Sequence, residues 1–212
     1  DYLALDPDSP WSEEARAALV AAEQRVAESL TRGRQALTPK LLEGDSSVVA
    51  EAARLNPQIA RELAYSSLLS DWVTAGTPAR AEAVIERLRW MGHAVVDGSI
   101  AGLAEVLESS QGEPESAIRG AVERYLEGAA LTAEGGNGEA ADADEEAAST
   151  PDLGVLGEWA RLDAGVAHFS NEGNYAESLR FVEAVRAEAD MNLTPVVVGR
   201  SHWMAGLIAT RR

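Results

Sequence analysis

Cysteine is absent from this chain of 212 residues, which excludes disulfides, thiolate metal sites and cysteine nucleophiles. Aromatic residues are scarce, at 5 %. No apolar run approaches the roughly 18 residues that a membrane-spanning helix requires, and no segment has the pattern of a signal peptide. We therefore expect no membrane partner and a cytoplasmic location.

Basic residues are also few, and only Lys40 among the 18 is a lysine. The formal net charge is −17, so the phosphates of a nucleic acid would be repelled and we expect no nucleic-acid partner. The arginine bias is common in GC-rich bacterial genomes. Because the chain starts at Asp1 and stops at Arg212, we expect it to be part of a longer protein.

Strand signals are nearly absent, whereas alanine is abundant and favours helices that approach closely. The sequence therefore predicts an all-α fold of about nine helices. The first long helix should begin near Pro10 and end at Gly33, with Leu19, Ala22, Val26 and Leu30 as its apolar stripe. The clearest joint is Gly76-Thr77-Pro78, where Gly ends one helix, Thr caps the next and Pro opens it. Residues 57–97 should therefore form an antiparallel helical hairpin.

Composition divides the chain into three parts. Residues 1–132 form a helical, repeat-like region, and residues 151–212 form a helical hairpin with a following helix. Between them, residues 133–150 are rich in Gly, Ala and acid and contain no large apolar side chain. We expect this middle segment to be a solvated loop or linker that adds nothing to the core.

The segment 159–190 carries apolar residues at helical spacing on both sides of a turn at 171–174. It resembles a single tetratricopeptide hairpin, in which Phe169 and Tyr175 should meet across the turn. A last helix from Pro195 should cover the hairpin with Met204 and Ile208 turned inward. Such hairpins bury their stripes only by stacking, so the resemblance implies a tetratricopeptide-like right-handed array of antiparallel hairpins.

Four segments are similar to the helical repeat region of bacterial CHAT-domain proteins: YLALDPDSPWSEEARAAL, LNPQIARELAYSSLLSDWVTAG with PARAEAVIERLRWMGHAVV, GNYAESLRFVEAVRAEA, and PVVVGRSHWMAGLIATRR. CHAT is a caspase-like peptidase domain that uses a His and a Cys. The resemblance implies that this chain is the regulatory, partner-binding helical part of a larger protein. Without cysteine, any catalytic domain lies outside it.

No catalytic or metal-binding pattern stands out. His93, His168 and His202 lack a second ligand at metal spacing, so structural or surface roles are favoured. We expect no cofactor, no metal and no enzymatic activity. Trp90 lies about 100° from the stripe of its helix, so it either packs on a second neighbour or lines a groove. With Trp90, the residues Arg61, Arg87 and Arg89 are the candidates for partner binding, where arginines suit an acidic or carboxylate ligand; ordinary surface ion pairs are their alternative role.

The sequence thus favours a non-enzymatic interaction or scaffold module that binds a protein or peptide, either in another chain or within its parent. Two alternatives stay open. The chain could be a purely structural segment that packs on the rest of its parent, which a lack of contiguous exposed apolar surface would favour. It could also be an enzyme of unrecognised type, which a pocket with convergent ionisable groups would favour.

Overall fold

The computed structural model describes residues 10–110, 117–171, 174–188 and 194–211, and all regular structure in these ranges is helical. The helices are α2 (Pro10–Ala36), α3 (Pro39–Leu42), α4 (Ser46–Leu55), α5 (Pro57–Leu63), η1 (Ala64–Leu68), α6 (Leu69–Val73), α7 (Pro78–Ala94), α8 (Ser99–Ser109), α9 (Ala117–Glu134), α10 (Asn137–Ala148), α11 (Gly154–Ser170), α12 (Tyr175–Glu188) and α13 (Pro195–Ala209). The all-α prediction is confirmed. With α5, η1 and α6 counted as one continuous helix, the described residues form eleven helices rather than about nine, and α3 and α10 are the additional two.

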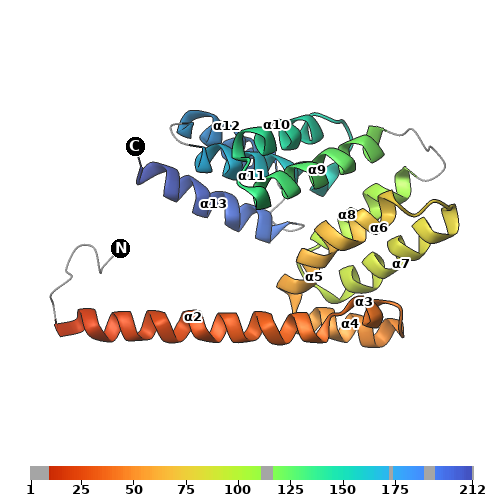
Figure 1. Ribbon diagram of the computed structural model, residues 1–212, viewed down its shortest axis with the longest axis horizontal. Helices are drawn as coiled ribbons and strands as arrows, with labels where there is room; N and C mark the ends of the chain where they lie inside the picture. The colour runs from red at the N-terminus through yellow and green to blue at the C-terminus, as the bar shows by residue number, and fades with distance from the viewer. Residues whose placement is uncertain (1–9, 111–116, 172–173, 189–193, 212) are drawn as a thin grey trace.

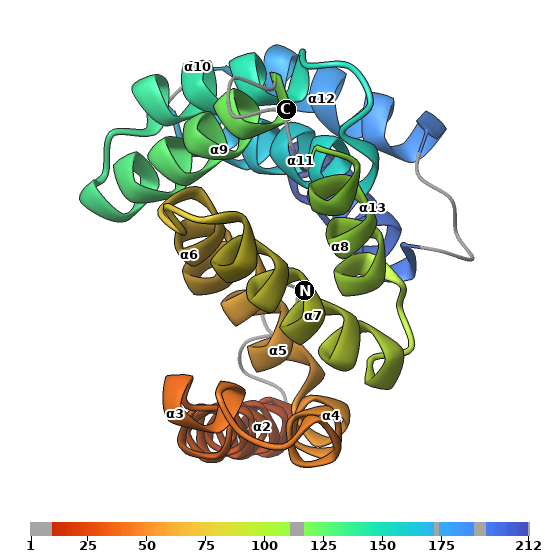
Figure 2. The same ribbon diagram turned by 90° about the vertical axis from the view of Figure 1, so that its right-hand side faces the viewer.

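The helices form three groups along the chain (Figures 1 and 2). Helix α2 lies at one end with α3 and α4 beside its C-terminal part, and helices α9 to α13 gather at the opposite end. Helices α5 to α8 lie between them. Each helix from α9 to α13 packs on the next, while contacts of α6 with α9 and of α8 with α11 join the middle group to the last one.

The hairpin predicted over residues 57–97 is confirmed, because two helices that run in opposite directions meet at the 74–77 joint (Figure 1). Gly76 has φ +65°, a conformation that glycine adopts without strain. The Thr77 hydroxyl accepts a hydrogen bond of 3.3 Å from the Arg80 amide, and Pro78 occupies the first turn. The cap residues therefore mark this joint in the sequence.

Within the first arm of the hairpin, η1 is a π-helical turn. Ile59 and Ala60 are buried before it, Ala64 and Leu68 are buried at its two ends, and Leu69 and Trp72 are buried after it. On a regular α-helix of 3.6 residues per turn the sets before and after it would face different directions. The wider π turn under-rotates the chain and keeps both sets against the core, and it sets the direction of Tyr65.

Helix α2 continues past Gly33 to Ala36, so the predicted end at Gly33 is wrong. Gly33 is buried against the start of α5, where an added Cβ would lie 2.8 Å from Cγ1 of Ile59. This glycine therefore permits close packing inside a helix instead of ending one.

The prediction that residues 133–150 form a solvated loop outside the core is also wrong, because Asn137–Ala148 is helix α10. Ala140, Ala141, Ala147 and Ala148 are all buried, and α10 packs between α9 and α11. The buried positions recur at helical spacing, but they carry methyl groups rather than large side chains. A segment can therefore be a core helix with no large apolar residue, provided that its neighbours come close.

Helix α10 is also held by a polar contact near its C-terminal end. Nε2 of His168 on α11 lies 2.6 Å from Oε1 of Glu145 on α10, and Asn174 lies 2.8 Å from Nδ1 of the same ring. The His168 ring stacks on Phe181 at 5.6 Å between centroids. If the Asn174 amide donates to Nδ1, the ring carries its proton on Nε2 and donates it to Glu145. His168 therefore links three helices, in agreement with its expected structural role.

The C-terminal hairpin matches its predicted packing. The rings of Phe169 and Tyr175 meet at 5.6 Å, and Met204 and Ile208 of α13 are buried. Residues 172 and 173 of the turn, and residues 189 and 190 at the predicted end of the second helix, lie outside the described residues.

We predict that Ala141→Leu lowers the free energy of unfolding by about 1–3 kcal/mol, because α10 has no room for a larger side chain where it meets α9 and α11. Urea denaturation of the full chain measures this effect. Ala133→Leu, at an exposed position of α9, is the control and should change stability little. Equal stability of the two variants would contradict the close packing of α10.

Candidate functional site

A cleft with chemically varied walls has a volume of about 710 Å³ and lies where α5 and η1 meet α9, α11 and α13. Its lining combines three aromatic rings, two arginines and two carboxylates with smaller groups: Gln58, Arg61, Glu62, Tyr65, Ser66, Tyr125, Trp159, Asp163, Val196 and Arg200. These residues come from segments more than a hundred positions apart in the sequence. The cleft is therefore a product of tertiary packing between the middle and last groups of helices.

Three aromatic rings form one wall of the cleft. Tyr65 of η1 packs edge-on against Tyr125 of α9, with ring centroids 6.3 Å apart. It also packs against Trp159 of α11 in a tilted arrangement, with centroids 5.2 Å apart. All three residues are buried. Such contacts stabilise a rigid wall, since aromatic pairs add roughly 0.5–1.5 kcal/mol beyond their burial.

Both tyrosine hydroxyls donate to groups of the protein itself. Tyr65 donates to the backbone carbonyl of Ser99 at 3.0 Å, and Tyr125 donates to Oδ2 of Asp163 at 3.1 Å. Burial raises the pKa of each phenol well above its ordinary value, and the nearby charge of Asp97 or Asp163 adds to the effect. Both tyrosines therefore stay neutral, and a ligand meets their rings rather than free hydroxyls.

Arg200 of α13 lies over the indole of Trp159, with its guanidinium carbon 4.9 Å from the ring centroid. Its Nη2 is 3.9 Å from Oδ1 of Asp163, a long and weak ion pair, and about half of the Arg200 side chain is exposed. Burial raises the pKa of Asp163, and Arg200 and the Tyr125 hydroxyl offset this only in part. The carboxylate is thus incompletely neutralised by its own chain.

Only one of the four predicted binding residues lines this cleft. Arg61 is there, but its guanidinium is bound to Asp97, which also caps the start of α8 by accepting a 3.0 Å hydrogen bond from the Ser99 amide. Arg89 is held between Glu82 at 3.0 Å and Glu108 at 2.6 Å. Trp90 packs against the core, and Arg87 is half-buried outside the cleft.

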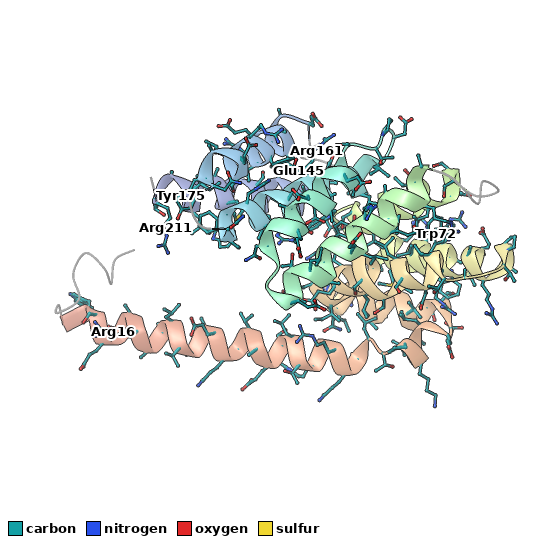
Figure 3. The ribbon with its side chains drawn as sticks, turned by 45° about the horizontal axis from the view of Figure 1, so that its top comes forward. Arg16, Trp72, Glu145, Arg161, Tyr175 and Arg211 are labelled. Carbon is teal, nitrogen blue, oxygen red and sulfur yellow. The ribbon has the colours of Figure 1, made fainter. Side chains whose placement is uncertain are left out.

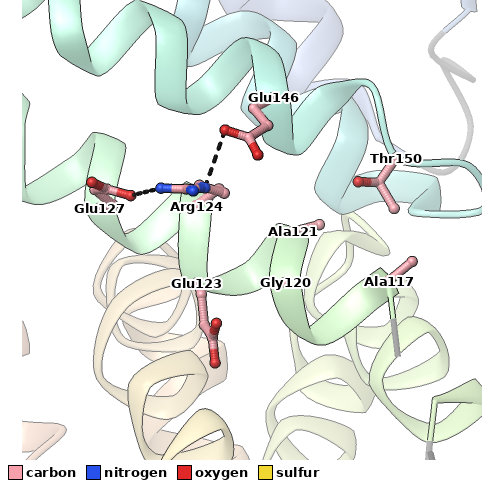
Figure 4. Close-up of a pocket in the computed structure, with 8 residues that line it drawn as sticks. All are labelled: Ala117, Gly120, Ala121, Glu123, Arg124, Glu127, Glu146 and Thr150. Carbon is pink, nitrogen blue, oxygen red and sulfur yellow. Dashed lines mark hydrogen bonds and ion pairs between the residues drawn. The ribbon is translucent and has the colours of Figure 1, made fainter. Parts of the chain in front are cut away.

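A second hollow, of about 540 Å³, lies between α9 and the end of α10 (Figure 4). Arg124 at its centre pairs with Glu127 at 2.6 Å and with Glu146 at 3.1 Å. Because the arginine is neutralised from both sides and most of the other lining residues are small, this hollow is a weaker candidate than the aromatic cleft.

Behind the cleft lies a carboxyl group that sequence reasoning assigned to the solvated acidic run. Asp144 of α10 is buried, and its Oδ1 has no hydrogen-bond partner among the described residues. It faces Gly128 of α9, where any Cβ would collide with the carboxyl group. Burial, with a smaller contribution from the charge of Asp163, raises the pKa of Asp144 to about 8. The spacing Ala140, Ala141, Asp144, Ala147, Ala148 would have indicated that this acid lies on a buried helix face.

Within the described ranges, no three His, Cys, Asp or Glu side chains gather as a metal-binding group, and no helix has the length and apolar character needed to cross a membrane. Comparison of the chain with protein-family models, with curated proteins and with solved structures gives no match.

We predict that Asp144→Asn stabilises the protein above about pH 8 and reduces the pH dependence of its stability. Between the ordinary pKa of 3.8 and the folded value of about 8, the folded chain holds a proton that the unfolded chain has lost. Stability contributed by this group is therefore present at low pH and is lost as the pH rises through this window. One pKa unit corresponds to about 1.4 kcal/mol, so the raised pKa of Asp144 sets an upper bound of several kcal/mol on the stabilisation. We expect Asp144→Asn to raise the free energy of unfolding above about pH 8 by on the order of 1–3 kcal/mol.

Chemical denaturation at about pH 5 and about pH 9 measures the effect. Asp142→Asn removes an exposed carboxylate from the same helix and is the matched control. A residual slope from Asp163 should remain in the Asp144→Asn protein. If both variants behave alike at both pH values, Asp144 is not held as a buried acid.

Proposed function

We propose that this chain is a non-enzymatic protein-interaction module that takes a cationic side chain of a partner, best an arginine, into the cleft beside Trp159. The observation that carries the proposal is the position of Arg200, whose guanidinium lies over the indole and next to Asp163. A guanidinium on an aromatic face, with a carboxylate beside it, is a favourable arrangement in proteins. Arg200 acts as a built-in occupant of a site that a partner residue can share or take over.

Three properties favour a cation over an anion as the ligand. The net charge of −17 attracts basic segments and repels acidic ones over long range. Arg61 is already neutralised by Asp97. Burial raises the pKa of Asp163 because it destabilises the ionised carboxylate. A cation that comes closer to the carboxylate than the 3.9 Å of Arg200 would stabilise the ionised form.

The sign of the pH dependence follows from Asp163. A cation binds the ionised carboxylate, so binding is strongest above the raised pKa of Asp163 and is lost as the pH falls through it. If Arg61 or Arg200 instead bound a carboxylate of the ligand, ionised Asp163 would repel that ligand. Binding would then weaken as the pH rises through the pKa of Asp163.

The order in which the helices pack also supports an interaction module. Consecutive antiparallel helices that pack in chain order, as α9 to α13 do, are the building plan of tetratricopeptide-like arrays, which commonly bind peptides. We therefore retain, as part of the proposal, a tetratricopeptide-like stack and a regulatory role within a larger CHAT-type protein.

An enzyme is the less favoured function. Ser66 is the one hydroxyl nucleophile among the cleft-lining residues that is not a phenol, and its Oγ donates to the backbone carbonyl of Glu62 rather than to a base. A purely structural role is the outcome to which a failed binding experiment would point.

We predict that a short acetylated and amidated peptide with a central arginine binds the full chain, and that the same peptide with citrulline, a neutral isostere of arginine, does not. Arg200→Ala should open the indole face and tighten binding by up to about tenfold, because a partly desolvated cation–π contact is worth on the order of 1–2 kcal/mol. Asp163→Asn should weaken binding. Isothermal titration calorimetry measures all three.

Arg180→Ala is the matched control, because Arg180 also lies over an aromatic ring, that of Phe181 at 4.1 Å, but on α12 and outside the cleft. It should leave the affinity unchanged. Equal affinity for the arginine and citrulline peptides, or no binding by either the native chain or Arg200→Ala, would refute the proposed cation site.

A further inference from the structure

One face of α2 carries several exposed apolar side chains. Four of the large apolar side chains that are exposed in the described residues belong to this helix: Trp11, Leu19, Val20 and Val26. Figure 1 shows the N-terminal part of α2 projecting from the body, and Figure 3 shows its side chains, Arg16 among them, standing clear of the other drawn helices. Among the described helices, α2 makes its main contacts with α4 and α5.

This face is continuous with the one that holds α2 on the body. Counted at 3.6 residues per turn, Trp11, Ala15, Leu19, Ala22 and Val26 share one side of the helix with Leu30, Gly33 and Leu37. Leu37 and Gly33 are buried, and Leu30 packs against the core. The same stripe is therefore covered at its C-terminal end, and Ser12 is buried at its N-terminal end, whereas Trp11, Leu19 and Val26 are exposed.

The open stripe has a heptad-like spacing. Ala15, Leu19, Ala22 and Val26 recur at intervals of four, three and four residues, the seam spacing of paired helices. Val20 is as exposed as Leu19, at 51 % against 50 %, but it lies on the opposite side of the helix. Exposure alone therefore does not define the stripe.

We infer that this face pairs with the same face of a second copy of the chain, with the two α2 helices antiparallel. In the register that sets Leu19 of one copy beside Ala22 of the other, Ala15 lies beside Val26 and Trp11 beside Leu30. The paired segment covers residues 11–30, about 30 Å of helix at 1.5 Å per residue. The two bodies then lie at opposite ends of the pair, because each holds its own helix beyond residue 30.

Charge complementarity selects this arrangement. Arg16 and Glu23 lie on the same flank of the stripe, and the antiparallel register brings Arg16 of each copy to Glu23 of the other, which gives two symmetric ion pairs. Arg16 also has an interaction within its own chain, and a guanidinium has enough donors for a second carboxylate. In a parallel pair, Arg16 would face the Trp11 side of the seam and Glu23 would face Ala18, so neither charge would meet its opposite.

Sedimentation equilibrium of the full chain over a concentration series tests the dimer. We expect a mass that rises toward twice that of the monomer. Leu19→Glu with Val26→Glu should return the mass to that of the monomer, a halving, whereas Val20→Glu, the equally exposed control on the far side, should leave the dimer intact. A native chain that stays monomeric throughout, or a dimer that only Val20→Glu abolishes, would overturn the proposal.

A charge exchange tests the direction of the helices. Arg16→Glu alone and Glu23→Arg alone should each weaken the dimer, and the double variant should restore it, because the opposite charges meet again across the pair. Loss of the dimer in the double variant would overturn the antiparallel register.

The absence of native cysteine allows a final test by crosslinking. A chain with both Ala15→Cys and Val26→Cys should form a disulfide-linked dimer on oxidation, since these positions face each other between copies. Each single variant should not, because identical positions lie far apart in an antiparallel pair. Efficient crosslinking of either single variant would indicate a parallel pair and would refute the assignment.

Discussion

The structure depends on helices that approach each other through glycine and alanine. A Cβ added at Gly92 of α7 would lie 2.7 Å from the backbone nitrogen of Ala101 on α8, and one added at Gly165 of α11 would lie 3.2 Å from Cγ2 of Val182 on α12. Small residues lose little side-chain entropy on burial, and they let backbone pack on backbone. Small residues therefore let the helices of this chain approach closely and extend the core beyond its large apolar side chains.

Close packing of this kind has consequences for polar groups. Gly128 lets α10 approach α9 so closely that the Asp144 carboxyl is enclosed, without a hydrogen-bond partner for its Oδ1. Where helices meet at an angle, small residues no longer fill the gap, and the rings of Tyr65, Tyr125 and Trp159 occupy it instead. The cleft lies where these rings fill the space between helix groups. Small residues pack the helices within each group, and the aromatic site therefore lies between the groups.

Local chemistry could be predicted from the sequence, and long-range contacts could not. The joint at 76–78 follows from the Thr77 cap, and the start of α13 follows from Pro195 in its first turn. The ion pair of Arg61 with Asp97 joins residues 36 positions apart, and the hydrogen bond from Tyr125 to Asp163 spans 38. No periodicity encodes such pairs, which is why Arg61 was the single predicted binding residue in the cleft. Helix α10 was missed for another reason: its buried face is made of alanine, and a search for large apolar residues does not detect it.

The same contrast explains why the exposed face of α2 is unusual within this molecule. Where α9, α10 and α11 bury their faces against one another, many of the contacts are methyl groups and hydrogens; where α2 leaves its face open, the side chains include Trp11, Leu19 and Val26. Large side chains gain more from leaving water than alanine does, at roughly 25 cal/mol for each Å² of apolar surface buried. They also keep helix axes farther apart than alanine does. Residue size therefore distinguishes the alanine-rich packing around α10 from the face of α2 that we infer to pair with a second copy.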